Sequence, residues 1–392
     1  VTIAVGYPLA MVLSNAFVPG IQDFWGANGG RGAFRDTTME GTFALTTLAV
    51  VSVLLTHTLY GMRKSLRAAK RLGNYLIERE LGKGGMGQVY LAQHALMCRP
   101  TAIKTMQDTA AESPAELARF EREVRLSATL THPNTITIYD FGRTADNAFY
   151  YAMEYLEGLD LQALVERFGP VLAERTVFVL RQVCGSLGEA HDRGIVHRDV
   201  KPSNIFLTHR GGLYDFAKVL DFGLAKQIRS NEAAAVTKTG MLFGTPRYLA
   251  PEMVYGSEEI DGRADLYNVG GIAYWMITGQ PPFASSSSVE VIIDHVKTTP
   301  TRPSKISELP IPRDLDDLIM KCLEKKPGDR YQTASELDAA LAAIHFDGPW
   351  SQEKAKQWWG LHAPDDARVA ECVCKAEEGS RLMDLGQPVA TA

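Results

Sequence analysis

The sequence predicts an α+β protein in which a strand-rich small lobe is followed by a helix-rich large lobe, preceded by one or two transmembrane helices. Three observations support this expectation. A strand, a glycine-rich turn and a second strand follow one another over residues 75–92, and the pattern becomes mostly helical from Thr176 onward. Residues 43–62 contain no Asp, Glu, Lys or Arg. The small lobe is expected over residues 75–156 and the large lobe over residues 157–346.

The composition of the 392 residues, 45% hydrophobic and 22% charged, is that of a chain with a sizeable core. The net charge of −5 shows no basic excess, so binding of nucleic acid is not expected. The five cysteines are scattered and form no CxxC pair, which indicates a reducing compartment rather than a disulfide framework. The chain starts at Val1 rather than Met, so we expect a fragment or a processed form.

Residues 43–62 read FALTTLAVVSVLLTHTLYGM and are long enough to cross about 30 Å of hydrocarbon as a helix. Residues 63–71, RKSLRAAKR, follow with five basic side chains in nine positions. Basic residues flank the cytoplasmic end of a span, so we expect a protein of the cell (inner) membrane in which the chain after residue 62 is cytoplasmic. A buried core helix is the alternative. A cleaved signal peptide is disfavoured because its basic residues would come first.

The segments next to this span are assigned by composition. Residues 1–42 are expected to hold a partial first transmembrane segment and a short outer loop, because residues 1–18 carry no charge and a glycine-rich stretch follows them. A hydrophobic re-entrant piece is the alternative to a second span. Residues 63–74 are interpreted as a basic juxtamembrane segment.

The tail, residues 347–392, contains three tryptophans within ten positions, namely Trp350, Trp358 and Trp359. Large aromatic side chains gain free energy when they are buried. We therefore expect the tryptophans to dock the tail on the surface of the domain. Binding of a partner protein is the alternative.

Gly82, Gly84 and Gly87 form a G-x-G-x-x-G-x-V pattern that ends at Val89. Glycines let the backbone of a hairpin approach phosphate oxygens closely and direct N–H groups at them. Dinucleotide-binding folds share this pattern, but in those folds a helix follows the glycines. Because strands are expected on both sides here, the pattern favours a hairpin that covers phosphates.

Lys104 lies near the end of an apolar strand over residues 100–106. Glu123 lies on a helix that begins after a capping signal at Ser113, and it borders the buried face of that helix. A charge in this place is costly unless it is paired. We therefore expect Lys104 and Glu123 to form an ion pair that holds the ammonium toward the α and β phosphates of a nucleotide. A plain surface cation is the alternative for Lys104.

Residues 194–204, GIVHRDVKPSN, gather charged and polar side chains directly after an apolar helix-like run. In this loop Asp199 could accept a proton from an attacking hydroxyl, and Lys201 could neutralise charge on a transferred phosphoryl group. Asn204 offers a carbonyl oxygen, which Mg²⁺ accepts readily. Asp221, at the end of a strand seventeen residues further on, completes a candidate pair of magnesium ligands with Asn204. A solvated surface turn is the alternative for the loop.

These motifs together resemble the signature set of eukaryotic-like (Hanks-type) serine/threonine protein kinases of the bacterial, membrane-anchored kind. The resemblance covers residues 75–344. It implies a two-lobed protein kinase fold that transfers the γ-phosphate of ATP to serine or threonine hydroxyls of protein substrates in signal transduction, with Asp199 as the catalytic base. It also implies Mg²⁺ as the metal, with Mn²⁺ as an alternative, and a homodimer.

The same resemblance implies an adenine pocket behind the glycine-rich hairpin. Met153 would precede the hinge segment that hydrogen-bonds the base, and apolar side chains would enclose the base from both lobes. The expected nucleotide-binding residues are Leu81, Gly82, Gly84, Gly87, Val89, Ala102, Lys104, Glu154, Leu156 and Phe206.

Structural and regulatory residues follow from the resemblance as well. Asp265 would tie down the catalytic loop, and Arg330 would pair with Glu252 at the end of the activation segment. Thr237 and Thr239, in AVTKTG, are the expected sites of regulatory autophosphorylation. An ordinary loop hydroxyl is the alternative for each of these threonines.

Three other classes of protein are alternatives to this interpretation. A pseudokinase, which keeps the fold for binding alone, would usually lose the lysine or one of the aspartates that this chain retains. A sensor or transport component with the kinase as its output is a second alternative. One or two spans with a short outer loop cannot form a transport path alone. A small-molecule phosphotransferase on the same fold is disfavoured by the complete activation segment.

Overall fold

The computed structural model describes residues 49, 51–53, 55–56, 71–84, 87–106, 114–144, 148–222, 246–255 and 260–363. The chain divides into two units, Val1–Lys70 and Arg71–Ala392. In the first unit the described residues are helical and their side chains are exposed. The membrane span expected at residues 43–62 lies mostly outside the described residues. In the parts of the chain that the structure describes, no helix is both long enough and apolar enough to cross a membrane.

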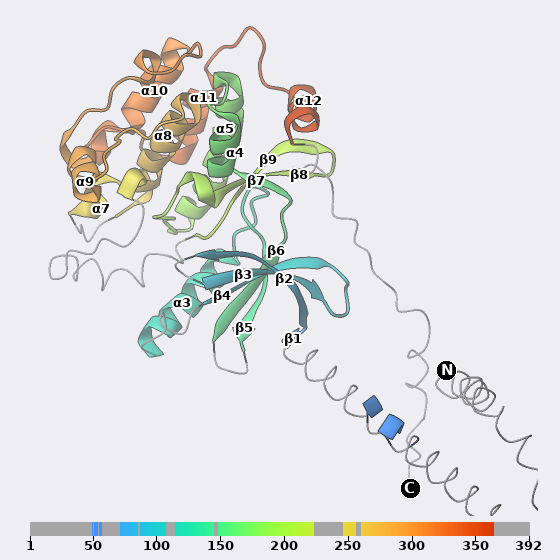
Figure 1. Ribbon diagram of the computed structural model, residues 1–392. Coiled ribbons are helices and arrows are strands. Elements are labelled where there is room, and N and C mark those ends of the chain that lie inside the picture. Colours follow the sequence, from blue (N-terminus) through green and yellow to red (C-terminus); the bar gives the residue numbers. More distant parts are fainter. Residues whose placement is uncertain are drawn as a thin grey trace, which may run out of the picture. The chain divides into compact units, whose positions relative to one another are not determined.

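The second unit starts with a six-stranded antiparallel sheet in the order β1-β2-β3-β4-β6-β5, drawn with α3 beside it in Figure 1. The glycine-rich pattern forms the hairpin between β2 and β3, where Gly84 pairs with Gly87. The elements of this small lobe are β1 (Arg71–Leu72), β2 (Tyr75–Gly84), β3 (Gly87–His94), β4 (Pro100–Met106), α3 (Pro114–Ser127), β5 (Ile138–Arg143) and β6 (Phe149–Glu154).

Strand β6 shows why the small lobe has a core on each face of its sheet. Every residue of β6 is buried, and successive side chains of a strand point to opposite faces. Phe149, Tyr151 and Met153 belong to a cluster with Val124 of α3. Tyr150 and its alternate neighbour Ala152 belong to a second cluster, with residues of β1 to β4. The two adjacent tyrosines therefore lie on opposite faces of the sheet.

The large lobe, shown above the sheet in Figure 1, is helical apart from a small sheet in the order β7-β8-β9. Its core forms around α8, which is buried at fourteen positions and ends at Gly279 in the left-handed conformation that favours glycine. The elements are β7 (Gly158–Asp160), α4 (Leu161–Phe168), α5 (Ala173–Asp192), β8 (Ile205–Arg210), β9 (Leu213–Val219), α7 (Pro251–Val254), α8 (Gly262–Thr278), α9 (Ser288–Lys297), α10 (Arg313–Cys322), α11 (Ala334–Ala342) and α12 (Gln352–His362).

Helix α12 confirms that the tryptophans dock the tail on the domain. Ser351 caps the helix by accepting a hydrogen bond from the backbone N–H of Lys354. Trp359 is buried in the core of the large lobe, and Trp358 packs against the same cluster. The indole N–H groups of Trp350 and Trp359 both donate to the carboxylate of Asp215, at 2.8 Å each. The packed structure therefore extends through α12.

Candidate active site

A cleft of about 540 Å³ lies between the sheet of the small lobe and the first elements of the large lobe. Val89 and Ala102 line it from β3 and β4, and Phe206 lines it from β8. Gly84 and Gly87 lie at the tip of the hairpin and are not among its lining residues. The other sequence-predicted nucleotide-binding residues all line this cleft: Leu81, Gly82, Val89, Ala102, Lys104, Glu154, Leu156 and Phe206.

Glu154 lines the cleft, but its carboxylate is engaged by three residues that do not line it. It accepts from Lys218 Nζ at 2.5 Å and from the backbone N–H of Thr137 at 2.9 Å. Arg210 contributes a further contact at 3.2 Å. Lys218 is almost fully buried, and burial lowers its pKa although Glu154 raises it. Any contact of Glu154 with a base would therefore use its backbone and not its side chain.

The loop that carries Asp199 is fixed by hydrogen bonds to Asp265 of α8, whose side chain has 0% exposure. Its two carboxylate oxygens accept the backbone N–H groups of His197 and Arg198, at 2.8 Å each. Nε2 of His191 contacts the same carboxylate at 2.9 Å. Arg198 has a φ of 64°, an unusual value for a non-glycine residue, which these bonds stabilise. The structure thus confirms that Asp265 ties down this loop.

Asp199, Lys201 and Asn204 lie together on this loop. Nζ of Lys201 donates to Oδ2 of Asp199 at 2.8 Å. The amide nitrogen of Asn204 donates to the backbone oxygen of Asp199 at 2.8 Å and to its Oδ2 at 3.2 Å. Because both donors share Oδ2, Oδ1 of Asp199 is left for a further hydrogen bond. The same arrangement leaves the carbonyl oxygen of the Asn204 amide as its ligand atom.

Asp221 follows β9 and closes the inner end of the cleft. The backbone N–H of Leu220 donates to the backbone oxygen of Asn204 at 2.8 Å, which holds the two segments side by side. Oδ2 of Asp221 contacts Nζ of Lys104 at 2.5 Å, and Oδ1 accepts from the hydroxyl of Tyr151 at 2.6 Å. Burial favours the protonated carboxyl, but Lys104 and the hydrogen bonds from Lys104 and Tyr151 outweigh it and lower the pKa of Asp221.

The donor atoms of Asp221 and Asn204 fit a hard divalent cation. Mg²⁺ is commonly held by one or two protein oxygen ligands, with water and substrate phosphates as the other ligands. Among the described residues no group of three or more His, Cys, Asp and Glu side chains could hold a metal ion by itself. Because Asp221 and Asn204 offer one carboxylate and one amide oxygen, their chemistry agrees with a site that shares its metal with phosphate oxygens.

The partner of Lys104 differs from the sequence-based expectation. The sequence predicts an ion pair with Glu123, whereas the structure pairs Lys104 with Asp221. Glu123 lies half-buried on α3. The physical reason is that the fold places the half-buried carboxylate of Asp221 within reach of Nζ of Lys104, and a half-buried charge is costly unless it is paired.

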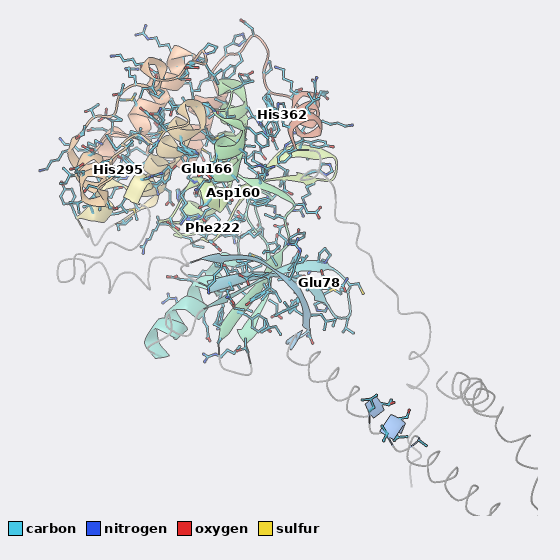
Figure 2. The ribbon with its side chains drawn as sticks, in the orientation of Figure 1. Glu78, Asp160, Glu166, Phe222, His295 and His362 are labelled. Carbon is cyan, nitrogen blue, oxygen red and sulfur yellow. The ribbon has the colours of Figure 1, made fainter. Side chains whose placement is uncertain are left out.

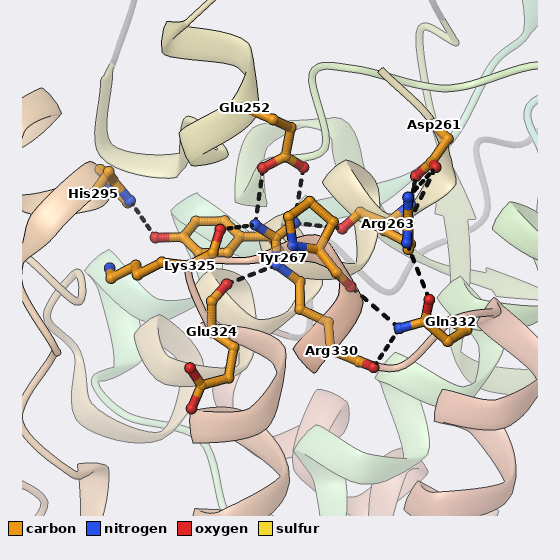
Figure 3. A network of polar contacts seen from close by, with 10 residues as sticks. Glu252, Asp261, Arg263, Tyr267, His295, Glu324, Lys325, Arg330 and Gln332 are labelled. Carbon is orange, nitrogen blue, oxygen red and sulfur yellow. Dashed lines mark hydrogen bonds and ion pairs between the residues drawn. The ribbon is translucent and has the colours of Figure 1, made fainter. Parts of the chain in front are cut away.

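The expected pair of Arg330 and Glu252 is confirmed. Nη1 and Nη2 of Arg330 donate to the two oxygens of Glu252 at 2.8 Å each, in a bidentate pair that Figure 3 shows. The guanidinium also donates to the backbone oxygens of Arg263, Glu324 and Lys325, at 2.7–3.1 Å. The helix that ends the activation segment is thereby fixed on the large lobe.

Two features of the site were not predicted from the sequence, and a third lies outside the described residues. The contact of Tyr151 with Asp221 was not foreseen, although period-2 alternation in β6 places this tyrosine on the face of Met153. Phe222 is buried beside His197, with ring centroids 4.7 Å apart, next to the small lobe in Figure 2. The expected phosphorylation sites Thr237 and Thr239 lie outside the described residues.

Comparisons with known proteins agree on the family. A family model of the protein kinase domain matches residues 75–341. Serine/threonine-protein kinase pkn3 of Myxococcus xanthus is 38% identical over 272 residues, which is 69% of this chain and 50% of that protein. Serine/threonine-protein kinase PknB of Mycobacterium tuberculosis is also 38% identical over 272 residues, 42% of its length. The match therefore spans half the length of these curated relatives or less.

Solved structures show the same fold. The crystal structure of the Mycobacterium tuberculosis PknI kinase domain matches with a TM-score of 0.53 and 29% identity, covering 69% of this chain and 96% of that one. Rad53 residues 1–466 in complex with AMP-PNP match with a TM-score of 0.57 at 24% identity, a likeness of fold alone. The chain therefore belongs to the protein kinase family, with a two-lobed domain of the bacterial Hanks-type serine/threonine class.

Proposed function

We propose that this chain is a membrane-anchored serine/threonine protein kinase that transfers the γ-phosphate of ATP to serine and threonine hydroxyls of protein substrates. Two groups of residues carry the proposal. Asp199, Lys201 and Asn204 contact one another. The backbone bond from Leu220 to Asn204 holds this group beside Asp221, which lines the cleft together with its partner Lys104. Phosphoryl transfer needs little covalent chemistry from the protein, so positioning and charge compensation account for most of the catalysis.

Asp199 is the proposed catalytic base. Its Oδ2 is held by Lys201 and Asn204, so Oδ1 is the atom that would orient the substrate hydroxyl and accept its proton as the new P–O bond forms. Lys201, 2.8 Å from Asp199, would neutralise charge on the transferred phosphoryl group. The hydroxyl oxygen attacks the γ-phosphorus, the bond to the β-phosphate oxygen breaks, and ADP leaves with that oxygen.

Asp221 and Asn204 are the proposed ligands of Mg²⁺, with Mn²⁺ as an alternative. The metal, when bound there with ATP, would compensate negative charge on the β and γ phosphates. Lys104 would then turn from Asp221 toward the α and β phosphates, with Glu123 of α3 as its proposed partner in that state. The flexible stem of a lysine permits such an exchange of partners.

The cleft residues supply the proposed binding site of the nucleotide. Leu81, Val89, Ala102, Leu156 and Phe206 would enclose the adenine, since apolar surfaces above and below a base are the usual lining of such pockets. The glycine hairpin, with Gly82, Gly84 and Gly87, would cover the phosphates.

Control of the kinase is proposed to run through Thr237 and Thr239 in the activation segment. A phosphate on either residue could pair with Arg198, which adjoins Asp199, and thereby order the segment. A homodimer that phosphorylates itself is proposed in addition, together with protein substrates in signal transduction.

Membrane anchoring is proposed from residues 43–62 and the basic segment that follows them. Val51, Val53 and Leu55 are exposed by 53%, 67% and 59%, as apolar side chains of a lipid-facing helix would be. The kinase domain, with proposed bounds 75–346 and with β1 and α12 packed against it, would then lie on the cytoplasmic side of the cell (inner) membrane. The basic segment over residues 63–74, which contains β1 near its end, would join it to the span. Residues 1–42 would form a partial first span and outer loop. Carbonate extraction of isolated membranes tests this, since an anchored chain stays in the pellet.

The activity is tested by phosphate transfer from labelled ATP with Mg²⁺ to a generic protein substrate and to the full chain itself. Asp199→Asn and Lys104→Met are expected to lower the rate by about 10²-fold or more, because each removes a group that acts on the transferred phosphate or its acceptor. Asp192→Asn, at an exposed aspartate of α5, is the matched control and should retain the wild-type rate. Label should map to serine or threonine, with Thr237 or Thr239 among the sites. A folded, ATP-binding wild type without transfer would instead support a pseudokinase that serves as a scaffold.

A further inference from the structure

Two side chains from neighbouring strands hold the carboxylate of Asp221, one on each oxygen. Lys104 of β4 and Tyr151 of β6 are direct partners in the antiparallel register, so both project to the same face of the sheet. Nζ of Lys104 reaches Oδ2 at 2.5 Å, and the hydroxyl of Tyr151 reaches Oδ1 at 2.6 Å. The sheet of the small lobe therefore fixes an acidic residue that belongs to the large lobe.

The two donors differ in rigidity. Tyr151 is 1% exposed, and its ring is held by packing among Val124, Phe149 and Met153. Lys104 has a flexible stem, and its ammonium is needed elsewhere once phosphates enter the cleft. The hydroxyl of Tyr151 therefore stays within hydrogen-bond distance of Oδ1 while the ammonium of Lys104 is free to move.

We propose that Tyr151 is a positioning residue that fixes the carboxylate of Asp221 through Oδ1 and so prepares Asp221 to bind the metal of the metal–nucleotide complex. This inference rests on the proposed function of Asp221 as a metal ligand. When Lys104 moves to the phosphates, Tyr151 is the donor that stays on Asp221. Each carboxylate oxygen has two lone pairs, so Oδ1 can accept from Tyr151 and still bind a cation.

The expected effect is on metal affinity and not on nucleotide affinity as such. Outer partners that orient a metal ligand typically contribute 10- to 100-fold to metal affinity. Lys104 also contacts Asp221 and can hold its carboxylate in part when the hydroxyl of Tyr151 is removed. We therefore expect Tyr151→Phe to raise the Mg²⁺ concentration for half-maximal binding of AMP-PNP about tenfold, at the lower end of this range. Binding of AMP-PNP without metal should stay at its wild-type affinity, since Tyr151 does not line the cleft.

Tyr150→Phe is the matched control. Tyr150 is the adjacent residue of β6, is similarly buried and loses the same hydroxyl, but it packs in the cluster on the other face of the sheet. It should keep the wild-type Mg²⁺ requirement. The experiment uses the full chain and measures fluorescence of a labelled AMP-PNP over a Mg²⁺ titration, with thermal unfolding of each variant.

Several outcomes overturn the inference. A Mg²⁺ requirement of Tyr151→Phe equal to that of wild type does so, and so does an equal loss of metal-free nucleotide binding, which indicates a packing role. Asp221→Asn gives a second measurement: in that background Tyr151→Phe should add no further effect, and an undiminished effect contradicts the inference. If wild type binds AMP-PNP with Mg²⁺ but transfers no phosphate, the kinase proposal fails while the role of Tyr151 stands. If wild-type binding does not depend on Mg²⁺, both fail.

Discussion

Asp215 and Asp221 lie six residues apart, on β9 and just after it, and they show two opposite uses of a carboxylate. Both have a left-handed backbone, with φ of 51° and 57°. The side chain of Asp215 has 0% exposure, whereas that of Asp221 keeps 21%. Similar local backbone therefore carries one aspartate into the interior and turns the other toward the cleft.

The surroundings of Asp215 leave its carboxylate nothing further to bind. Nε and Nη2 of Arg175 donate to its two oxygens at 2.8 and 2.7 Å, and the indoles of Trp350 and Trp359 add one donor to each oxygen. The guanidinium of Arg175 also lies over the ring of Trp358, 3.9 Å from its centroid. All four acceptor positions of the carboxylate are thus taken.

Asp221 instead has one donor on each oxygen, from Lys104 and Tyr151, and faces the cleft. Half of its acceptor capacity is therefore left for a cation. The difference indicates how the two sites are distinguished physically. A saturated buried carboxylate stabilises the fold, whereas one that is rigidly held but only half satisfied is suited to bind a ligand.

The largest expected effect comes from the half-satisfied carboxylate. Asp221→Asn keeps the shape but removes the charge, so phosphate transfer should fall by about 10²- to 10³-fold. The free energy of unfolding should change by about 1 kcal/mol or less, because Lys104 retains contact with water. Transfer assays and urea unfolding measure the two quantities. Substantial unfolding of Asp221→Asn would show that Asp221 is structural as well, and the distinction from Asp215 would fail.

Asp215→Ala should lower the stability of the fold and leave the Mg²⁺ requirement unchanged. It leaves Arg175, whose side chain is 4% exposed, without its ionic partner, so the free energy of unfolding should fall by about 3–5 kcal/mol. Asp338→Ala breaks an exposed pair between α11 and Arg181, which lies on α5 as Arg175 does, and should cost less than about 1 kcal/mol. At temperatures where Asp215→Ala is folded, its Mg²⁺ requirement should equal that of wild type. A raised requirement would mean that β9 transmits the change to Asp221.

Smaller losses of stability are expected when the tail tryptophans that donate to Asp215 are replaced. Trp359→Phe removes a buried hydrogen bond to a charged acceptor and should cost about 2 kcal/mol of unfolding free energy. Trp350→Phe, at a half-buried position, should cost about 1 kcal/mol. Trp275→Phe is the control, because its indole N–H has no hydrogen-bond partner in the described part of the molecule. Urea unfolding that ranks Trp275→Phe with Trp359→Phe would show that ring volume, and not the bond to Asp215, is what matters.

The contacts that could best be predicted from the sequence are those between residues that lie only a few positions apart. Asp199, Lys201 and Asn204 occur within six positions, and a loop of that length brings their side chains together in many conformations. The anchoring by Asp265 and the pair of Arg330 with Glu252 were predicted through resemblance to a family and are confirmed.

Contacts between distant parts of the chain were not predictable from spacing. Asp215 and Trp359 are separated by 144 residues, and the composition of the tail indicated docking without naming its partner. The hydroxyl of Tyr151 is one of two in the run Tyr150-Tyr151, and only the register of β6 against β4 decides which one reaches Asp221. Lys104 was assigned to Glu123 because both were identified as charged residues in need of partners, but the distances that select Asp221 exist only in the folded chain.

The smallest expected effect is a pH dependence in another saturated network of the large lobe. His295 is 1% exposed; its Nδ1 contacts the hydroxyl of Tyr267 at 2.8 Å, as Figure 3 shows, and its Nε2 contacts the backbone oxygen of Arg247 at 3.0 Å. Burial, partly offset by the bond to Arg247, lowers its pKa from 6.5 to about 4, with Lys325 and Asp294 as opposing nearby charges. A neutral ring that accepts from Tyr267 and donates to Arg247 accounts for this direction.

Because the folded pKa of His295 lies below the unfolded value, the unfolded chain binds more protons between pH 6.5 and 4. The contribution is therefore fully present above pH 6.5 and decreases as the pH falls toward 4. We expect a loss of about 1 kcal/mol of unfolding free energy at pH 5.5 relative to pH 8. His295→Gln should flatten the urea-unfolding curve against pH by this amount, and His345→Gln, at an exposed position, should not. Parallel pH curves for wild type and His295→Gln would contradict the lowered pKa of His295.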